Sequence, residues 1–171
     1  MLQLKNDQEL NLIRITFGIS SMDKILIVGA NGSVGKSCVN NLKENNDLVL
    51  ISRSEFDSDI EGNFEKNLLD INNYSETVNF INNIDYEISG IVFAIGSIDL
   101  KPFSSTSLED FKKIMDENFY NIVHFLNNCI NKMSDSSSVV FFSSIAAVRG
   151  FKNHTAISSA KSALIGLSNS L

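Results

Sequence analysis

Tryptophan is absent from this 171-residue sequence, and proline and cysteine are rare, with one and two residues respectively. The two cysteines, Cys38 and Cys129, are far apart and follow no metal-binding spacing. This arrangement predicts reduced packing residues on helices and excludes both a disulfide framework and a metal site. With 43% hydrophobic residues, the chain is long enough for one α/β domain with a complete core.

Positive charge and long apolar segments are also scarce. The formal net charge of −6 argues against a broad nucleic-acid or membrane-binding surface. Lys36, Arg53 and Lys161 could still form a local basic pocket for a phosphate ligand. No apolar run approaches the length of a membrane span, and Asp7 and Glu9 stand where a signal peptide needs basic and apolar residues. We therefore predict a cytoplasmic protein without nucleic-acid or membrane partners.

Five short apolar segments alternate with helical patterns. They cover residues 24–28, 48–52, 63–69, 90–94 and 138–142. Unbroken apolar strands separated by helices predict a parallel sheet that is covered on both faces. Residues 1–21 fit this pattern poorly. We interpret them as an N-terminal appendage, either disordered or a short strand, and assign the domain to residues 22–171.

The clearest predicted helix spans residues 108–132, with Ser107 and Asp110 as a capping box at its start. An apolar stripe that should face the core follows, formed by Phe111, Ile114, Met115, Phe119, Ile122, Leu126 and Cys129. Asn118 falls on this stripe, and a buried amide needs hydrogen-bond partners or a function. His124 lies off the stripe and is predicted to be a surface residue.

The segment after the first apolar strand matches two phosphate-binding patterns. Gly29, Gly32 and Gly35 are three residues apart, as in a dinucleotide-binding turn, where small residues let the backbone approach a pyrophosphate at a helix N-terminus. Residues 30–37 also satisfy a relaxed P-loop pattern, and an ordinary strand-to-helix turn is a third interpretation. An NTPase further needs an acidic residue at the end of another strand, and only the weak strand before Asp70 offers one. We therefore favour the dinucleotide turn.

From residue 23 onward the sequence resembles the short-chain dehydrogenase/reductase family, with several of its motifs in order. The glycine turn is the first of them. Arg53 follows the second strand, at the position where the family distinguishes its cofactors. An acidic residue there would hold the adenosine ribose, whereas arginine can pair with a 2′-phosphate. The resemblance therefore implies NADP, with NAD less favoured. A solvated loop cation is the alternative interpretation of Arg53.

The resemblance also implies which residues bind the cofactor. Asp70 matches the aspartate at the edge of the adenine, and Ala94 and Gly96 match the small-residue turn that the nicotinamide ribose approaches. The complete implied set is Gly29, Asn31, Gly32, Ser33, Val34, Gly35, Arg53, Asp70, Ala94, Gly96 and Lys161.

The implied catalytic residues depart from the family pattern at one position. The resemblance assigns Ser144 to polarising a substrate carbonyl, Asn118 to ordering a water and Lys161 to the nicotinamide ribose. Ile157 stands where the family has a tyrosine acid. Three outcomes are open. His154 acts as a substitute acid, Ser144 and a water relayed to Lys161 carry the proton, or the hydride step is lost.

The resemblance implies a Rossmann-like doubly wound parallel sheet in the order 3-2-1-4-5, truncated before the last two strands of the family. The expected function is NADP(H)-dependent interconversion of a carbonyl and an alcohol, most similar to the 3-oxoacyl-acyl-carrier-protein reductase type. The alternative is a catalytically impaired NADP-binding sensor or scaffold. Helices at 108–132 and 157–171 imply a homo-oligomer, because these helices commonly pair in the family.

Overall fold

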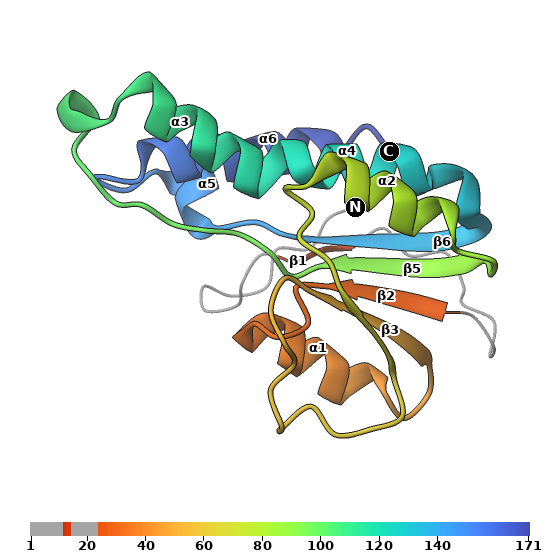
Figure 1. Cartoon of the computed structure of the whole chain (residues 1–171). Coiled ribbons are helices and arrows are strands. Elements are labelled where there is room, and N and C mark those ends of the chain that lie inside the picture. The colour runs from red at the N-terminus through yellow and green to blue at the C-terminus, as the bar shows by residue number, and fades with distance from the viewer. Residues whose placement is uncertain (1–11, 15–23) are drawn as a thin grey trace.

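The computed structural model describes residues 12–14 and 24–171, and its strands form one six-stranded sheet (Figure 1). The strands are β1 (Leu12–Arg14), β2 (Lys24–Val28), β3 (Asp47–Ser52), β4 (Glu65–Leu68), β5 (Ile88–Phe93) and β6 (Met133–Phe142). Their spatial order is β1-β6-β5-β2-β3-β4. The five strands from β2 to β6 are parallel, and counted along the chain their order is the predicted 3-2-1-4-5. The short strand β1 pairs antiparallel with β6 at the other edge.

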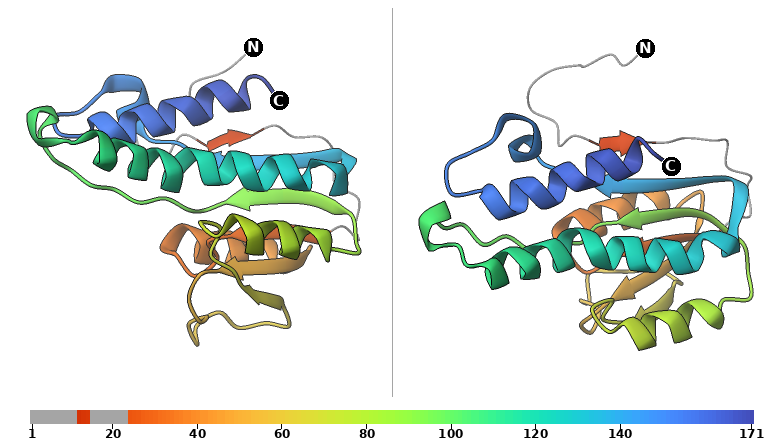
Figure 2. Two further views of the ribbon diagram at one scale, coloured as in Figure 1. Left: turned by 45° about the horizontal axis from the view of Figure 1, so that its top comes forward. Right: turned by 90° about the horizontal axis from the view of Figure 1, so that it is seen from above.

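Helices lie on both faces of this sheet, as the buried strands require. They are α1 (Ser33–Leu42), α2 (Tyr74–Asn82), α3 (Leu108–Met115), α4 (Asn121–Cys129), α5 (Ile145–Arg149) and α6 (Thr155–Ser168), with short 3-10 turns at Phe103–Ser105 and Ile130–Lys132. Figures 1 and 2 show α2, α3, α4 and α6 on one face and α1 on the other. Helices α3 and α4 follow each other as one continuous rod, called the α3–α4 rod below. This rod and α6 run side by side, and α3 packs against α6.

Successive strand residues face two different hydrophobic cores. In β2, Leu26 and Val28 pack beneath the larger helical layer, whereas Ile25 and Ile27 pack toward α1 and its buried Val39. Both sets are shielded from water, which explains why β2 is an unbroken apolar run rather than an alternating one. The sheet therefore forms a rigid central layer, and the loops at its edge carry the polar residues described below.

The helix predicted for residues 108–132 is present, with the Ser107–Asp110 capping box at its start. Sequence periodicity did not predict the π-helical turn Asp116–Tyr120 that separates α3 from α4. Asn118 lies in this turn and is fully buried. One extra residue in the turn shifts the direction of the side chains that follow, and such insertions frequently occur at functional sites.

Two details of the sequence interpretation change. Helix α6 begins at Thr155, near the predicted start at Ile157, but it ends at Ser168, so the prediction that it includes Leu171 is wrong. The last turn is closed by the N–H of Asn169, which donates to carbonyl groups of the preceding turn. His124 is half-buried rather than fully on the surface, because its ring stacks on a tyrosine ring at a centroid distance of 4.0 Å.

The predicted appendage, residues 1–21, lies outside the described residues except for β1. Both cysteines are free thiols on helices, as predicted, with Cys129 fully buried and Cys38 partly so. Burial raises the pKa of the Cys129 thiol to about 12. Within the described part of the chain, no helix has the length and apolar character that a bilayer span requires.

Candidate functional site

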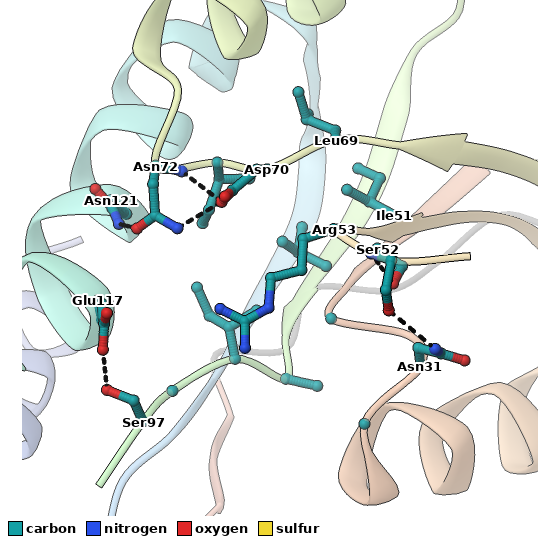
Figure 3. Close-up of a pocket in the computed structure, with 18 residues that line it drawn as sticks. Asn31, Ile51, Ser52, Arg53, Leu69, Asp70, Asn72, Ser97, Glu117 and Asn121 are labelled. Atoms are coloured by element: carbon teal, nitrogen blue, oxygen red, sulfur yellow. Dashed lines mark hydrogen bonds between the residues drawn. The ribbon is translucent and has the colours of Figure 1, made fainter. Parts of the chain in front are cut away.

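A cavity of about 290 Å³ opens at the edge of the sheet where the parallel strands β2, β3, β4 and β5 end (Figure 3). It is lined by Val28, Gly29, Asn31, Gly32, Ile51, Ser52, Arg53, Ser54, Leu69, Asp70, Ile71, Asn72, Ala94, Ile95, Gly96, Ser97, Glu117 and Asn121. The strand order reverses between β2 and β5. Open α/β sheets bind their ligands at such a reversal, because the loops after the two strands diverge and leave a crevice.

The glycine turn between β2 and α1 is shaped by close backbone contacts. Gly29 has a φ of +87°, and a β-carbon there would lie 2.5 Å from the carbonyl oxygen of Ala94. A β-carbon at Gly35 would overlap the carbonyl oxygen of Gly29. Gly32 is the N-cap of α1 and offers no side-chain cap. The turn is therefore a glycine-built cradle whose helix N-terminus can accept an anionic ligand.

Lys36 is engaged away from this cavity. Its Nζ lies 2.6 Å from a carboxylate oxygen of Asp57 and 2.9 Å from one of Asp59. The hydrogen bonds to these two carboxylates raise the pKa of Lys36. A P-loop lysine must reach phosphate groups, whereas this lysine holds the loop after β3. The expectation that Lys36 contributes to a basic pocket is therefore wrong, and the dinucleotide interpretation of the turn is the better one.

Arg53 is the cation that does face the cavity. Its guanidinium extends into the centre of the space in Figure 3, and it forms no hydrogen bond or ion pair with any described residue. Asn31 positions the loop that carries it. The Asn31 Nδ2 donates to the carbonyl oxygen of Glu55 at 2.9 Å, and its Oδ1 accepts from the Asp57 N–H at 3.0 Å. The glycine turn and the loop after Arg53 are thereby joined.

Three polar residues close one end of the cavity. An Asp70 carboxylate oxygen accepts a hydrogen bond from the backbone N–H of Asn72 at 3.0 Å. The Asn72 side-chain oxygen in turn accepts one from Asn121 Nδ2 at 2.6 Å. Asp70 was predicted from the resemblance, but Asn121 was missed. It lies off the predicted apolar stripe, and it directly follows the π-helical turn that periodicity did not predict.

At the other end of the cavity, the side chains of Asn118 and Lys161 both lie close to Gly96. A β-carbon at Gly96, which has a φ of +153°, would lie 2.6 Å from Asn118 Oδ1 and 3.1 Å from Lys161 Nζ. Lys161 is only 8% exposed, its Nζ donates to the Ile95 carbonyl oxygen at 3.4 Å, and burial lowers its pKa to about 8. An ammonium group with so little hydration favours an anionic or hydroxyl partner.

The amide of Asn118 is fixed by the chain itself. Its Nδ2 donates to the carbonyl oxygens of Ser97, at 3.1 Å, and Ile114, at 3.0 Å, and its Oδ1 accepts from the Ser97 N–H at 3.3 Å. This satisfies the requirement that a buried amide find partners. The side chain thus holds the loop after β5 against the α3–α4 rod.

The serines at the end of β6 have different roles. The Ser143 hydroxyl is buried and donates to the backbone carbonyl of Lys161 at 3.1 Å, which ties β6 to α6. Ser144 is the N-cap of α5, and its Oγ accepts from the Ala146 N–H at 3.2 Å. This contact uses an oxygen lone pair, and the hydroxyl proton of Ser144 has no acceptor among the described residues.

Ile157, which stands at the position of the missing tyrosine, and His154 lie at the start of α6. Ile157 is 5% exposed and packs in a cluster with Ile114 and Ala160. His154 precedes α6 as its N-cap and directs ring nitrogen Nδ1 to the Lys152 carbonyl oxygen at 2.7 Å. Its ring is therefore held by the loop that precedes the helix.

The predicted cofactor-binding residues fall into two groups. Those that line the cavity are Gly29, Asn31, Gly32, Arg53, Asp70, Ala94 and Gly96. Those that do not line it are Ser33, Val34, Gly35 and Lys161, and none of the predicted catalytic residues lines it either. Ser33 and Val34 border a separate, apolar cavity of about 550 Å³ on the α1 side of the sheet. Sequence reasoning missed six polar lining residues, Ser52, Ser54, Asn72, Ser97, Glu117 and Asn121.

The fold and the cradle define a Rossmann-type domain with a site at its strand reversal. Comparison with known families agrees with this class and identifies a family within it. A family model described as enoyl-(acyl carrier protein) reductase matches residues 29–171. The chain therefore belongs to the short-chain dehydrogenase/reductase family, whose members bind NAD(P). A comparison with curated protein sequences gives no match.

Solved structures support the same fold. A short chain dehydrogenase family protein from Francisella tularensis is 22% identical with a TM-score of 0.80, and the match covers 88% of this chain and 62% of that protein. The ligand-free aldohexose dehydrogenase of Thermoplasma acidophilum is 24% identical with a TM-score of 0.77, covering 86% and 59%. A 4-hydroxyisoleucine dehydrogenase complexed with NADH is 18% identical with a TM-score of 0.71, covering 85% and 66%. This chain thus spans about three-fifths of the length of the first two.

Proposed function

We propose that this chain is an NADP(H)-dependent oxidoreductase that interconverts a carbonyl and an alcohol. The observation that carries the proposal is Arg53, whose guanidinium has no partner among the described residues and is directed into a cavity whose other wall is the glycine cradle. Arginine binds phosphate through paired, charge-assisted hydrogen bonds. The 2′-phosphate on the adenosine ribose of NADP would supply such a partner, whereas NAD would leave the guanidinium without a phosphate partner.

The residues present suit each part of this cofactor. At Gly29 and Gly35 the turn leaves no room for a β-carbon, and the N-terminus of α1 would lie beside the diphosphate. Asp70 would border the adenine, and Gly96, with no β-carbon, would admit the nicotinamide ribose toward Lys161. When bound, the cofactor would supply or accept the hydride, and the protein would provide the positions of the reacting groups.

The chain's own residues would handle the substrate oxygen. The hydroxyl proton of Ser144, which has no acceptor in the described part of the chain, would polarise the carbonyl, and Lys161 would hold the ribose. Asn118 would keep the loop after β5 in place, because its amide is already bonded to Ser97 and Ile114. His154 remains a proposed acid whose ring must leave the Lys152 carbonyl to act. The implied homo-oligomer through the α3–α4 rod and α6 is part of the proposal.

One observation favours a second function, that of a catalytically impaired NADP-binding sensor or scaffold. Ile157, buried against Ile114 and Ala160, has no proton to transfer. Without a general acid, the rate of the reaction would fall by the contribution of general acid catalysis, about 10²- to 10⁴-fold.

A two-step measurement separates these functions. The first step titrates the full chain with NADPH and NADH by fluorescence, and the second assays turnover with a panel of ketones and aldehydes. Tight NADPH binding with turnover supports the oxidoreductase. Tight binding without turnover supports the sensor or scaffold, and the absence of binding to either nucleotide would overturn both.

A further inference from the structure

A carboxylate that none of the family motifs includes lies on the cavity wall. Glu117 is half-buried and precedes Asn118 in the π-helical turn. Its Oε2 accepts a short hydrogen bond from the Ser97 hydroxyl, as Figure 3 shows. Its other oxygen, Oε1, has no hydrogen-bond partner among the described residues. Glu117 therefore presents one oriented acceptor atom on the wall of the cavity.

The position of Glu117 along the wall narrows what this acceptor can bind. In Figure 3 it lies between Asn121, at the Asp70 end of the cavity, and Ser97, which follows Gly96 at the Lys161 end. Such a middle position corresponds to the sugar and phosphate portion of an extended dinucleotide rather than to either base. A carboxylate repels a phosphate group, so a hydroxyl is the donor that it can accept from there.

We infer that Glu117 accepts a hydrogen bond from a ribose hydroxyl of the bound dinucleotide, with Ser97 holding its carboxylate in place. The inference rests on the proposed function, because it needs a dinucleotide in the cavity. The π-helical turn supplies the geometric reason. It turns Asn118 into the core while Glu117 and Asn121, four residues apart, both line the cavity.

The experiment compares the dissociation constant for NADPH in wild type, E117A and D116A. Asp116 is a matched control, since it lies in the same turn and carries the same charge but does not line this cavity. Removing either carboxylate lowers the negative charge near the anionic cofactor by one unit. E117A should raise the dissociation constant about tenfold, the loss expected for one charge-assisted hydrogen bond. D116A should bind as wild type does or slightly more tightly.

Two further measurements separate recognition of ribose from structural support. S97A removes the positioning contact but leaves both Glu117 oxygens, so it should weaken NADPH binding by less than about threefold. Equal losses in S97A and E117A would show that Glu117 only braces the loop. The dissociation constant of either 2′,5′-ADP or nicotinamide mononucleotide, obtained by titrating each fragment alone, should rise in E117A for one of the two fragments, which identifies the ribose. No change for either fragment would overturn the inference.

The outcomes also distinguish this inference from the proposed function. If wild type binds neither NADPH nor NADH, the proposed function fails first. If wild type binds NADPH and E117A binds it equally well or better, only the assignment of Glu117 fails. Should E117A not fold, as judged by its circular dichroism, E117Q keeps the size and the acceptor and removes the charge. It should raise the dissociation constant about threefold relative to D116N.

Discussion

Gly35 packs directly against the carbonyl oxygen of Gly29, so closely that a β-carbon at Gly35 would overlap this oxygen and also lie within 2.9 Å of two backbone atoms of Ala30. The first turn of α1 is thereby held against the end of β2. The close packing of α1 on the turn, more than the conformational freedom of glycine, thus explains why position 35 is a glycine.

Gly35→Ala should consequently destabilise the fold by about 3 kcal/mol or more, because backbone atoms on the other side of the contact cannot move aside. Gly166→Ala is a suitable control. Gly166 lies in α6, and nothing lies within 4 Å of the added β-carbon. That change should stabilise the protein by up to about 1 kcal/mol through helix propensity. Urea unfolding of both variants measures the difference, and equal stabilities would contradict the packing argument.

Arg53→Ala tests the preference for NADP. Losing charge-assisted hydrogen bonds to a phosphate should weaken NADPH binding by about 10- to 100-fold. The dissociation constant for NADH should change by less than about threefold, since NADH lacks the 2′-phosphate. Fluorescence titration with both nucleotides provides the comparison within one variant. Equal losses for NADPH and NADH would assign Arg53 a different role.

Ile157→Tyr tests whether the site lacks only an acid. A tyrosine four residues before Lys161 lies one helical turn from the ammonium group, and a large gain in turnover, about 10²-fold or more, is expected if the remaining groups are competent. The ring must enter a space filled by Ile114 and Ala160, which should cost about 1–3 kcal/mol of stability.

Ile157→Phe is the matched control for this change, because it adds the ring without the hydroxyl. A rate gain in the tyrosine variant alone would identify proton transfer as the missing step. A similar rate in both variants would point to altered packing, and no gain in either would favour the sensor or scaffold.

The lowered pKa of Lys161, about 8, predicts how nucleotide affinity depends on pH. The protonated ammonium group is the form that attracts an anionic nucleotide. Affinity should therefore be nearly constant below about pH 8 and fall as pH rises above it. Lys161→Arg should move this break beyond the accessible range, because the guanidinium stays protonated. Binding titrations from pH 6 to 10 would show it, and an unchanged break in the arginine variant would assign the titration to another group.

Burial of Lys161 also predicts a pH dependence of stability. Its pKa in the folded state lies below the value of 10.5 that it has when exposed, so the unfolded chain binds more protons between about pH 8 and 10.5. The contribution of Lys161 to the free energy of unfolding should therefore increase as pH rises through this window. Lys161→Met should remove the increase, as measured by urea unfolding at pH 7.5 and 10. The same slope in both proteins would argue that the ammonium group is hydrated.

The parallel sheet, the cradle and the capping box at Ser107 were predictable from the sequence because each depends on local features, whereas the strand order was implied by the resemblance to the family. Strand burial on both faces requires unbroken apolar runs, and a close backbone approach requires glycine. The buried amide of Asn118 was predictable as well, since its place on an apolar stripe follows from helical periodicity.

The partners of individual side chains were decided by the tertiary structure alone. Lys36 pairs with Asp57 and Asp59 instead of facing the cavity, and Glu117 and Asn121 line it. Both results depend on segments distant in sequence, a folded loop after β3 in one case and the loops after β4 and β5 in the other. The π-helical turn is a second reason. It inserts one residue into the helix, so the side chains after it point in directions that a regular period of 3.6 residues does not predict. Sequence periodicity therefore determines which faces are buried, whereas the packing of distant loops determines which polar groups meet.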